Sequence, residues 1–207
     1  MKIRHVMLGA LALPALGLLA IGAFLAWGNR PVPQDLRLEA VTLVETKSIG
    51  IDDPWLTALA DRTPALLRLD LSTSGKLGTR ALNEDMNVWS RASQCDEGSG
   101  ARDIYARGPY FGRLLLPLGS RVDGDALEQA ERAAGDRHTY SVYIIPKGEA
   151  GTVADINDRG PYDLRTLSGP LCIRIGAGSM AFTGFRTNVV RVPEEQLLAA
   201  LSSSRGP

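Results

Sequence analysis

The feature that most constrains this chain is an apolar run near its N-terminus. Residues 6–27 contain no charged side chain. As a helix that rises about 1.5 Å per residue, this run would be about 33 Å long, which suffices to cross a bilayer core of about 30 Å. A cleavable signal peptide usually has a shorter apolar region, of about 7–15 residues, and an A-x-A-like exit. The nearest such exit, Ala26-Trp27-Gly28, carries a bulky Trp, so a retained transmembrane anchor is favoured over a cleaved signal.

The charged residues around this run orient the chain. Lys2 and Arg4 precede it together with the free amine, whereas the basic residues that follow it are diluted by Asp35. Because positive charge is retained on the cytoplasmic side of a membrane, we expect a single-pass protein with a cytoplasmic N-terminus. The absence of an N-x-S/T sequon fits the inner membrane and periplasm of a bacterium. The expected organisation is a cytoplasmic N-terminus (1–5), a transmembrane anchor (6–27), a linker (28–34) and an extracytoplasmic domain (35–207).

Length and charge bound the classes of function open to the exported part. With 207 residues, 44% of them hydrophobic, the chain has enough material for one domain beyond its apolar run. Of its 23 basic residues, Lys2 and Arg4 precede the run, which leaves 21 basic against 23 acidic side chains, a net charge of −2, for residues 28–207. This balance offers no basic footprint, so we expect no nucleic-acid partner. Two histidines and two distant cysteines give no zinc-ligand spacing, so we expect no metal site.

The two cysteines of the chain, Cys95 and Cys172, both lie in the exported part. An extracytoplasmic compartment permits oxidation, so we expect them to form a disulfide. The loop between them is long, and its closure would be worth about 4.5 kcal/mol on the chain-entropy model. The alternative is a pair of buried free thiols, which only geometry can exclude.

Short β-rich runs bounded by glycine or proline dominate the exported part. They occupy residues 36–46, 66–72, 111–117, 139–146, 170–175 and 188–193. Helical patterns occupy residues 54–62 (behind the N-cap Asp53), 125–135 and 193–201. Residues 73–100 read as long loops around one strand near Val88. Because strands do not alternate with helices, the sequence predicts a mainly β domain, α+β at its margins, with an antiparallel β-sandwich or jelly-roll-like fold and two or three short peripheral helices.

Two short motifs point to cofactor or nucleophile chemistry but lack the context that either needs. Residues 171–181, LCIRIGAGSMA, match the strand and G-x-G-x-x-A opening of a dinucleotide-binding unit. No helical pattern follows to aim its N-terminus at a pyrophosphate, so we expect a glycine-rich turn between two strands and no cofactor. Ser179 mimics a nucleophile elbow, but no histidine follows it, because His138 is the last one in the chain.

The most distinctive feature of the exported part is a sequence repeat. DIYARGPYFGRLL at residues 103–115 (the first repeat segment) returns as DINDRGPYDLRTL at residues 155–167 (the second repeat segment), with the same residue type at eight of thirteen positions. Gly-Pro restricts the backbone in both, so we expect similar turns at the starts of two strands. Converging on one surface, the Arg and Tyr side chains could grip a glycan ring or an anionic group. The candidate binding residues are Arg107, Tyr110, Arg159 and Tyr162. The alternative is turn chemistry alone, with each Arg lying over its Tyr as a local brace.

The dinucleotide-binding, nucleophile and metal-ligand motifs each lack a residue or an element that their chemistry needs, so binding is the expected activity. We expect a non-catalytic, membrane-anchored extracytoplasmic domain that serves as a binding or scaffold domain, an accessory subunit of a membrane or envelope complex. Its expected partners are the lipid bilayer, through the N-terminal helix, and a membrane or envelope protein. One alternative is a glycan-binding module. The other is an envelope hydrolase that uses paired carboxylates such as Glu149, Asp155 or Asp158 as general acid and base.

Overall fold

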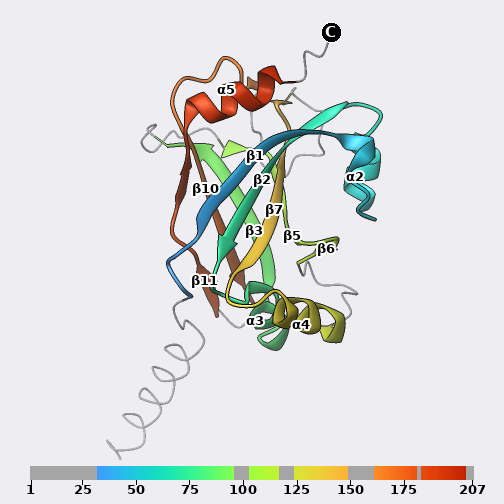
Figure 1. Cartoon of the computed structure of the whole chain (residues 1–207), viewed down its shortest axis with the longest axis vertical. Coiled ribbons are helices and arrows are strands. Elements are labelled where there is room, and N and C mark those ends of the chain that lie inside the picture. Colours follow the sequence, from blue (N-terminus) through green and yellow to red (C-terminus); the bar gives the residue numbers. More distant parts are fainter. Residues whose placement is uncertain (1–31, 96–102, 117–123, 149–160, 181–182, 204–207) are drawn as a thin grey trace, which may run out of the picture.

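The computed structural model describes residues 32–95, 103–116, 124–148, 161–180 and 183–203. Within them, antiparallel sheets make up most of the structure and the helices are few and short (Figure 1). The prediction of a mainly β, antiparallel domain is therefore confirmed. The described helices are α2 (Pro54–Leu59), α3 (Leu77–Asn83), α4 (Gly124–Ala133) and α5 (Glu194–Ser202), together with a 3₁₀ turn, η1 (Thr46–Ser48). Of these, α3 is the helix that the sequence does not predict.

The expected transmembrane anchor, residues 6–27, lies outside the described residues, as do residues 1–5 and most of the linker 28–34. In the part of the chain that the structure describes, no helix is both long and apolar enough to span a bilayer. The anchor, and the orientation derived from it, therefore stay predictions.

The strands form two larger sheets and one small ribbon, and the pairing is antiparallel throughout. The first sheet has the order β1 (Arg37–Glu45), β2 (Ala65–Thr73), β7 (His138–Ile144), β5 (Ala106–Phe111) and β6 (Leu114–Leu115). The second has the order β11 (Gly184–Arg186), β10 (Leu171–Gly178), β3 (Asn87–Gln94) and β4 (Asp103–Ile104), and β12 (Val190–Val192) also pairs with β10. The ribbon consists of β8 (Lys147–Gly148) and β9 (Tyr162–Asp163).

One hydrophobic core is shared by the two larger sheets, and the alternation of side chains along β2 explains how it forms. Leu67, Leu69 and Leu71 are completely buried on one face of β2, because successive strand residues point to opposite faces. The register sets these three opposite Ile144, Val142 and Tyr140 of β7. The second sheet contributes Val88, Ile173 and Ile175 to the same core. Full burial of one leucine contributes roughly 1.5–3 kcal/mol, so this face of β2 is a main source of stability.

The other face of the first sheet carries a smaller core that α2 covers. This core consists of Leu56, Leu59, Leu66, Tyr110, Tyr143 and Ile145. Helix α2 begins as the sequence predicts, with Pro54 in its first turn and Asp53 as N-cap. The Asp53 carboxylate accepts a hydrogen bond from the Trp55 N–H at 2.8 Å. Helix α2 is therefore held on the sheet by apolar packing and by a cap at its N-terminus.

Helix α3 forms inside residues 73–100, where the sequence predicts loops, and a distant carboxylate explains it. Glu131 in α4 is completely buried and accepts hydrogen bonds from the Gly78 and Thr79 N–H groups, each at 2.9 Å. It also accepts from the Thr79 hydroxyl at 2.6 Å and the Tyr140 hydroxyl at 2.7 Å. The first N–H groups of a helix lack intrahelical partners. Glu131 supplies these partners to α3 from another helix, so the local sequence around α3 does not contain its cap.

The run expected as one strand over residues 111–117 is, as far as residue 116, a hairpin in which a turn joins Phe111 of β5 to the short strand β6. Strand β5 ends at Phe111, which pairs with Leu114 of β6. Between them, Gly112 takes a φ of 58°, in the left-handed region that glycine adopts without a steric penalty. The prediction of a strand here is wrong because it passes through a glycine that reverses the chain.

Candidate functional site

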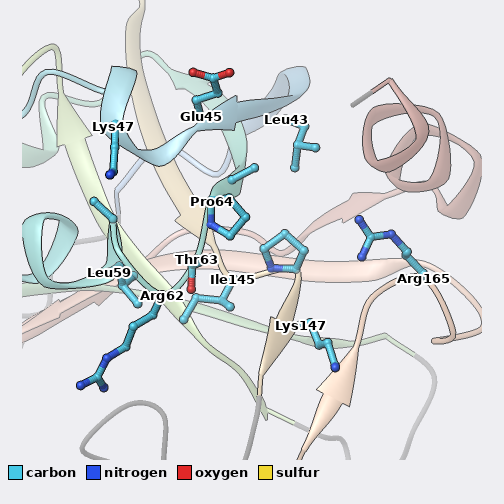
Figure 2. Close-up of a pocket in the computed structure, with 13 residues that line it drawn as sticks. Leu43, Glu45, Lys47, Leu59, Arg62, Thr63, Pro64, Ile145, Lys147 and Arg165 are labelled. Carbon is cyan, nitrogen blue, oxygen red and sulfur yellow. The ribbon is translucent and has the colours of Figure 1, made fainter. Parts of the chain in front are cut away.

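A cleft of about 790 Å³ opens at one end of the first sheet, where β1 and β7 end and β2 begins (Figure 2). Its charged lining consists of Glu45, Lys47, Arg62, Lys147 and Arg165. The remainder of its lining consists of Leu43, Leu59, Ala60, Thr63, Pro64, Ala65, Ile145 and Pro146. We call this feature the basic cleft. Its volume lies within the range of about 300–1,000 Å³ that is typical of ligand sites.

Prolines at the ends of strands shape the basic cleft. Pro64 directly precedes β2, and Pro146 follows two residues after the end of β7. Proline lacks the N–H that a sheet ladder needs, so pairing stops there and apolar rings are left at the end of the sheet. Thr46 ties the chain after β1 to the same place, because its N–H donates to the Pro64 carbonyl at 2.9 Å and its hydroxyl donates to the Thr63 carbonyl. These bonds fix the wall of the cleft that η1 and β2 share.

The positive charge of the basic cleft contrasts with the net charge of −2 of residues 28–207. Lys47 lies 3.5 Å from Asp61, but their side chains are 72% and 86% exposed, and such pairs contribute at most about 1 kcal/mol. Within the described residues, the side chains of Arg62 and Arg165 have no carboxylate at ion-pair distance. Figure 2 shows Arg165 directed toward the centre of the cleft, whereas Arg62 lies at the opposite rim with its guanidinium directed outward. This arrangement presents positive charge over an apolar floor, which suits an anionic ligand.

Arg107 and Tyr110 of the first repeat segment meet at a buried carboxylate. Asp53 is 2% exposed and accepts hydrogen bonds from Arg107 Nε at 3.0 Å and from the Tyr110 hydroxyl at 2.6 Å. Burial by itself would raise the pKa of Asp53, but the hydrogen bonds that this carboxylate accepts outweigh the effect and hold the pKa below its usual value. Burial raises the pKa of Tyr110, and the hydrogen bond to Asp53 adds to this shift. The carboxylate is therefore ionised and the phenol is protonated at neutral pH.

This geometry gives Arg107 and Tyr110 contacts inside the domain. Tyr110 is completely buried, and Arg107 lies over the Trp55 ring with its guanidinium carbon 5.9 Å from the ring centroid. Where the sequence suggested Arg over Tyr, the structure has Arg over Trp and a carboxylate that Arg and Tyr share. The segment also does not form the expected turn at the start of a strand, since residues 106–111 lie within β5, with an irregular register between Arg107 and Tyr110. Ligand contact by these two residues stays a prediction, and Tyr110 could make it only if α2 moved.

The second repeat segment is described from Pro161 onward, so Arg159 lies outside the described residues. Tyr162 lies in β9 and is 6% exposed, and its hydroxyl accepts a hydrogen bond from the Tyr105 N–H at 3.2 Å. Opposite it in β8 is Gly148, where a Cβ would come within 2.4 Å of the Tyr162 ring. Tyr105 belongs to the first repeat segment, so the two segments lie side by side at this point. A shared binding surface of all four candidate residues stays a prediction.

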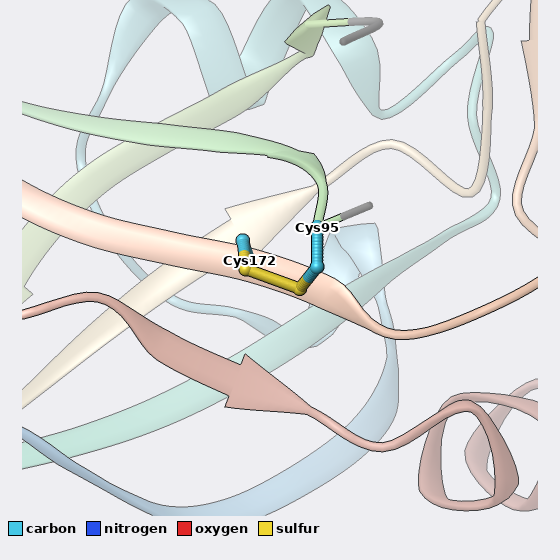
Figure 3. The surroundings of a disulfide bond; sticks show 2 residues. All are labelled: Cys95 and Cys172. Atoms are coloured by element: carbon cyan, nitrogen blue, oxygen red, sulfur yellow. A yellow bond between two sulfur atoms is a disulfide. The ribbon is translucent and has the colours of Figure 1, made fainter. Parts of the chain in front are cut away.

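The disulfide expected from the sequence is confirmed. Cys95 follows β3 and Cys172 lies in β10, with their Cα atoms 4.9 Å apart and a sequence separation of 77 residues (Figure 3). Strands β3 and β10 are paired neighbours, and the Cys95 N–H donates to the Pro170 carbonyl at 3.1 Å. The bond therefore fastens together two strands of the second sheet that are already aligned.

The structure describes most residues of the two motifs that the sequence associates with nucleophile or cofactor chemistry. His138 is 1% exposed, its pKa is lowered by burial, and its Nδ1 has no hydrogen-bond partner. The Ser179 hydroxyl lies 2.6 Å from that of Thr183, and the next element is β11, so the glycine-rich run leads into a strand and not into the helix of a dinucleotide site. Among the residues that the structure describes, no group of three His, Cys, Asp or Glu side chains could hold a metal ion. The carboxylates proposed for a hydrolase, Glu149, Asp155 and Asp158, lie outside the described residues.

The basic cleft could not be predicted from the sequence, because its cations come from separate segments of the chain. One local signal exists, since Arg62 and Lys147 each lie within two residues of a proline that ends a strand pairing. Nothing in the sequence shows that these two prolines lie at the same end of one sheet. Comparison of the chain with protein-family models, with curated proteins and with solved structures gave no match.

Proposed function

We propose that this protein is a non-catalytic, membrane-anchored extracytoplasmic domain that binds a partner at the basic cleft, as an accessory subunit of a membrane or envelope complex. The observation that carries the proposal is the cleft itself, which has the size of a ligand site and a charge opposite to that of the exported chain. Two sheets around one core suit the role of a sandwich-like scaffold, because rigid strands hold the walls of the cleft in place.

The basic cleft is remote from the point at which the chain enters the domain. The Gln34 side chain donates to the Arg186 carbonyl of β11 at 3.0 Å, which places the start of the domain beside that strand. From there β1 (Figure 1) runs for 9 residues and ends at the cleft, which its Leu43 and Glu45 line, a distance of about 30 Å at about 3.3 Å per residue. An anchor that precedes residue 32 would therefore be attached at the opposite end of the domain. A partner outside the bilayer could reach the cleft in this arrangement.

The two alternative functions have less support from the basic cleft. A sugar ring is gripped by stacking on an aromatic side chain, and no aromatic residue lines the cleft in the described part of the chain. A glycoside hydrolase needs two carboxyl groups about 5–10 Å apart. Glu45 is the one carboxylate among the described residues that line the cleft. Binding of an anionic partner uses the side chains that are present.

Site-specific photo-crosslinking in the native host tests the proposed function. A photoreactive amino acid would replace Thr63 inside the basic cleft of the full-length chain. The matched control would replace Met180, which is 95% exposed after the end of β10. We expect the membrane-bound protein to form an adduct from position 63 and none of comparable yield from position 180. Equal yields from the two positions, no adduct at all, or a mature N-terminus near Gly28 in a soluble protein would contradict the proposal.

A further inference from the structure

We propose that the occupant of the basic cleft is an acidic polypeptide segment that carries a large aliphatic side chain. This inference rests on the proposed function and adds the chemistry of the partner. Two properties of the cleft carry it, namely the placement of cations around its rim and the aliphatic character of its floor.

The cations surround the basic cleft and do not cluster at one point. Lys47 in η1 and Arg62 after α2 lie on one side, whereas Lys147 in β8 and Arg165 after β9 lie on the other (Figure 2). All four side chains are exposed. Positive charges on two facing rims fit carboxylates spaced along a chain better than a single small anion, which one pair of cations would satisfy. Exposed rim charges also accelerate the approach of an acidic partner and disfavour a basic one.

The floor of the basic cleft is aliphatic. Leu59 and Ile145, which are 6% and 4% exposed, lie beneath the floor. Leu43 and Pro64 line it and have apolar surface in contact with water. Covering this surface is favourable for any partner that brings an apolar group. An anionic glycan has carboxylates but no aliphatic side chain to cover the floor. An acidic peptide brings both groups on one flexible chain, so it matches the two properties together.

An anionic lipid also combines negative charge with an aliphatic chain, but the position of the basic cleft disfavours a bilayer. The cleft lies at the C-terminal end of β1, whose Leu43 and Glu45 line it, whereas residue 32 precedes the other end of this strand. A chain anchored before residue 32 would hold the cleft about the length of β1 away from its own attachment point, roughly 30 Å. A protein segment can reach that position and a headgroup in the same bilayer cannot do so easily.

Binding to defined peptide pools tests the inference. Full-length protein in detergent micelles would be mixed with a fluorescent acidic pool, in which Asp or Glu alternates with Leu, Ile or Val. In the matched amide pool, Asn or Gln replaces each Asp or Glu, and polygalacturonate serves as the anionic glycan probe. We expect the acidic pool to be retained about tenfold more than the amide pool at low salt, with the difference shrinking as salt rises.

A pair of charge reversals connects this binding to the basic cleft. Arg62→Glu combined with Arg165→Glu should lower retention of the acidic pool by about tenfold or more, because two attractive contacts become repulsive. The control combines Arg37→Glu with Arg186→Glu, two exposed residues outside the cleft that change the net charge equally. At an ionic strength of about 0.1 M the control should lower retention by no more than about twofold, since its charges lie roughly 30 Å from the site and the Debye length is about 10 Å.

Equal retention of the two pools, or retention that the cleft reversals do not change, would overturn the inference. Binding of polygalacturonate without binding of the acidic pool would overturn it as well. If the adduct formed at position 63 contained a protein segment without acidic residues, the inference would fail while the proposed function survived. An adduct with a glycan or a lipid would remove both. Absence of any adduct at position 63 would instead remove the proposed function, so the two failures are distinguishable.

Discussion

Replacing Asp53 with alanine tests how α2 is held on the first sheet. The Asp53 carboxylate caps α2 through the Trp55 N–H and accepts hydrogen bonds from Arg107 and Tyr110 of β5. Asp53→Ala removes these contacts together and leaves a guanidinium and a phenol without their partner. Because the carboxylate is 2% exposed, little water is available to take its place. We expect a large loss in the free energy of unfolding.

The magnitude of this loss follows from the separate contacts. Removal of an N-cap costs about 1 kcal/mol. Breaking a buried ion pair costs about 3–5 kcal/mol, but Arg107 is 23% exposed, so water can solvate it and the lower end applies. A buried hydroxyl without a partner, here that of Tyr110, adds roughly 1 kcal/mol. Contacts that share one carboxylate are not additive, and we expect a total loss of about 3–4 kcal/mol, or roughly 10 °C in Tm for a domain of this size.

Urea unfolding of the full-length chain, followed by far-UV circular dichroism, measures this loss. Asp61→Ala is the matched control, because its ion pair with Lys47 is exposed and its loss should cost no more than about 0.5 kcal/mol. Tyr110→Phe should cost about 1–2 kcal/mol, since it removes one hydrogen bond and leaves the helix cap in place. A loss below about 1 kcal/mol for Asp53→Ala would refute the view that this carboxylate fastens α2 to the sheet.

Three further outcomes are expected. Reduction of the Cys95–Cys172 bond should lower the free energy of unfolding by about 4 kcal/mol, because the 77-residue loop regains freedom in the unfolded chain; urea unfolding with and without reductant measures it. Glu131→Gln should destabilise the domain by roughly 2–3 kcal/mol in thermal unfolding, because an amide cannot accept from every donor that this carboxylate serves. Several hydrogen bonds, of which that from Thr73 has the largest effect, lower the pKa of Asp35 to about 2. The stability that Asp35 contributes is complete above its unfolded pKa near 4 and is lost as the pH falls toward 2, so Asp35→Asn should flatten the acid side of the pH–stability profile.

A control variant or a contradicting measurement checks each of these three outcomes. Glu128→Gln lies in the same helix as Glu131, but Glu128 is exposed, so it should change the Tm by no more than about 1 °C. A profile of equal steepness between pH 4 and pH 2 for Asp35→Asn and the parent would show that Asp35 carries no such stability. Equal urea midpoints before and after reduction would show that the disulfide adds nothing to an already aligned pair of strands.

Structural features that depend on a few neighbouring residues could be predicted from the sequence. The strand predicted over residues 66–72 and the Asp53-Pro54 start of α2 depend on local patterns, and the structure confirms both. The choice of Cys172 as the partner of Cys95 required no spatial information, because the chain has no other cysteine, and the geometry then excludes two free thiols. In each case the residues that decide the structure are adjacent in the sequence or have no competitors.

Features set by residues far apart in the sequence could not be predicted. Helix α3 depends on a cap from Glu131, which is 53 residues away from Gly78. The basic cleft gathers cations that extend along the chain from Lys47 to Arg165. A net charge of −2 counted over residues 28–207 conceals a local excess of positive charge at the basic cleft, because the count contains no information on where the side chains lie. Only the strand register brings these residues to one end of the sheet.

The two repeat segments show that the same residue in the same short sequence can have different hydrogen-bonding roles. The Tyr110 hydroxyl donates a hydrogen bond to a carboxylate, whereas the Tyr162 hydroxyl accepts one from a backbone N–H. A phenol can be donor or acceptor, so an identical Arg-Gly-Pro-Tyr sequence specifies neither role, and the neighbouring groups decide between them. Both rings are buried, with exposures of 0% and 6%, so either could reach a ligand only after a rearrangement of the domain. The cations of the basic cleft need no such rearrangement, and for this reason the functional proposal rests on the cleft and not on the repeat.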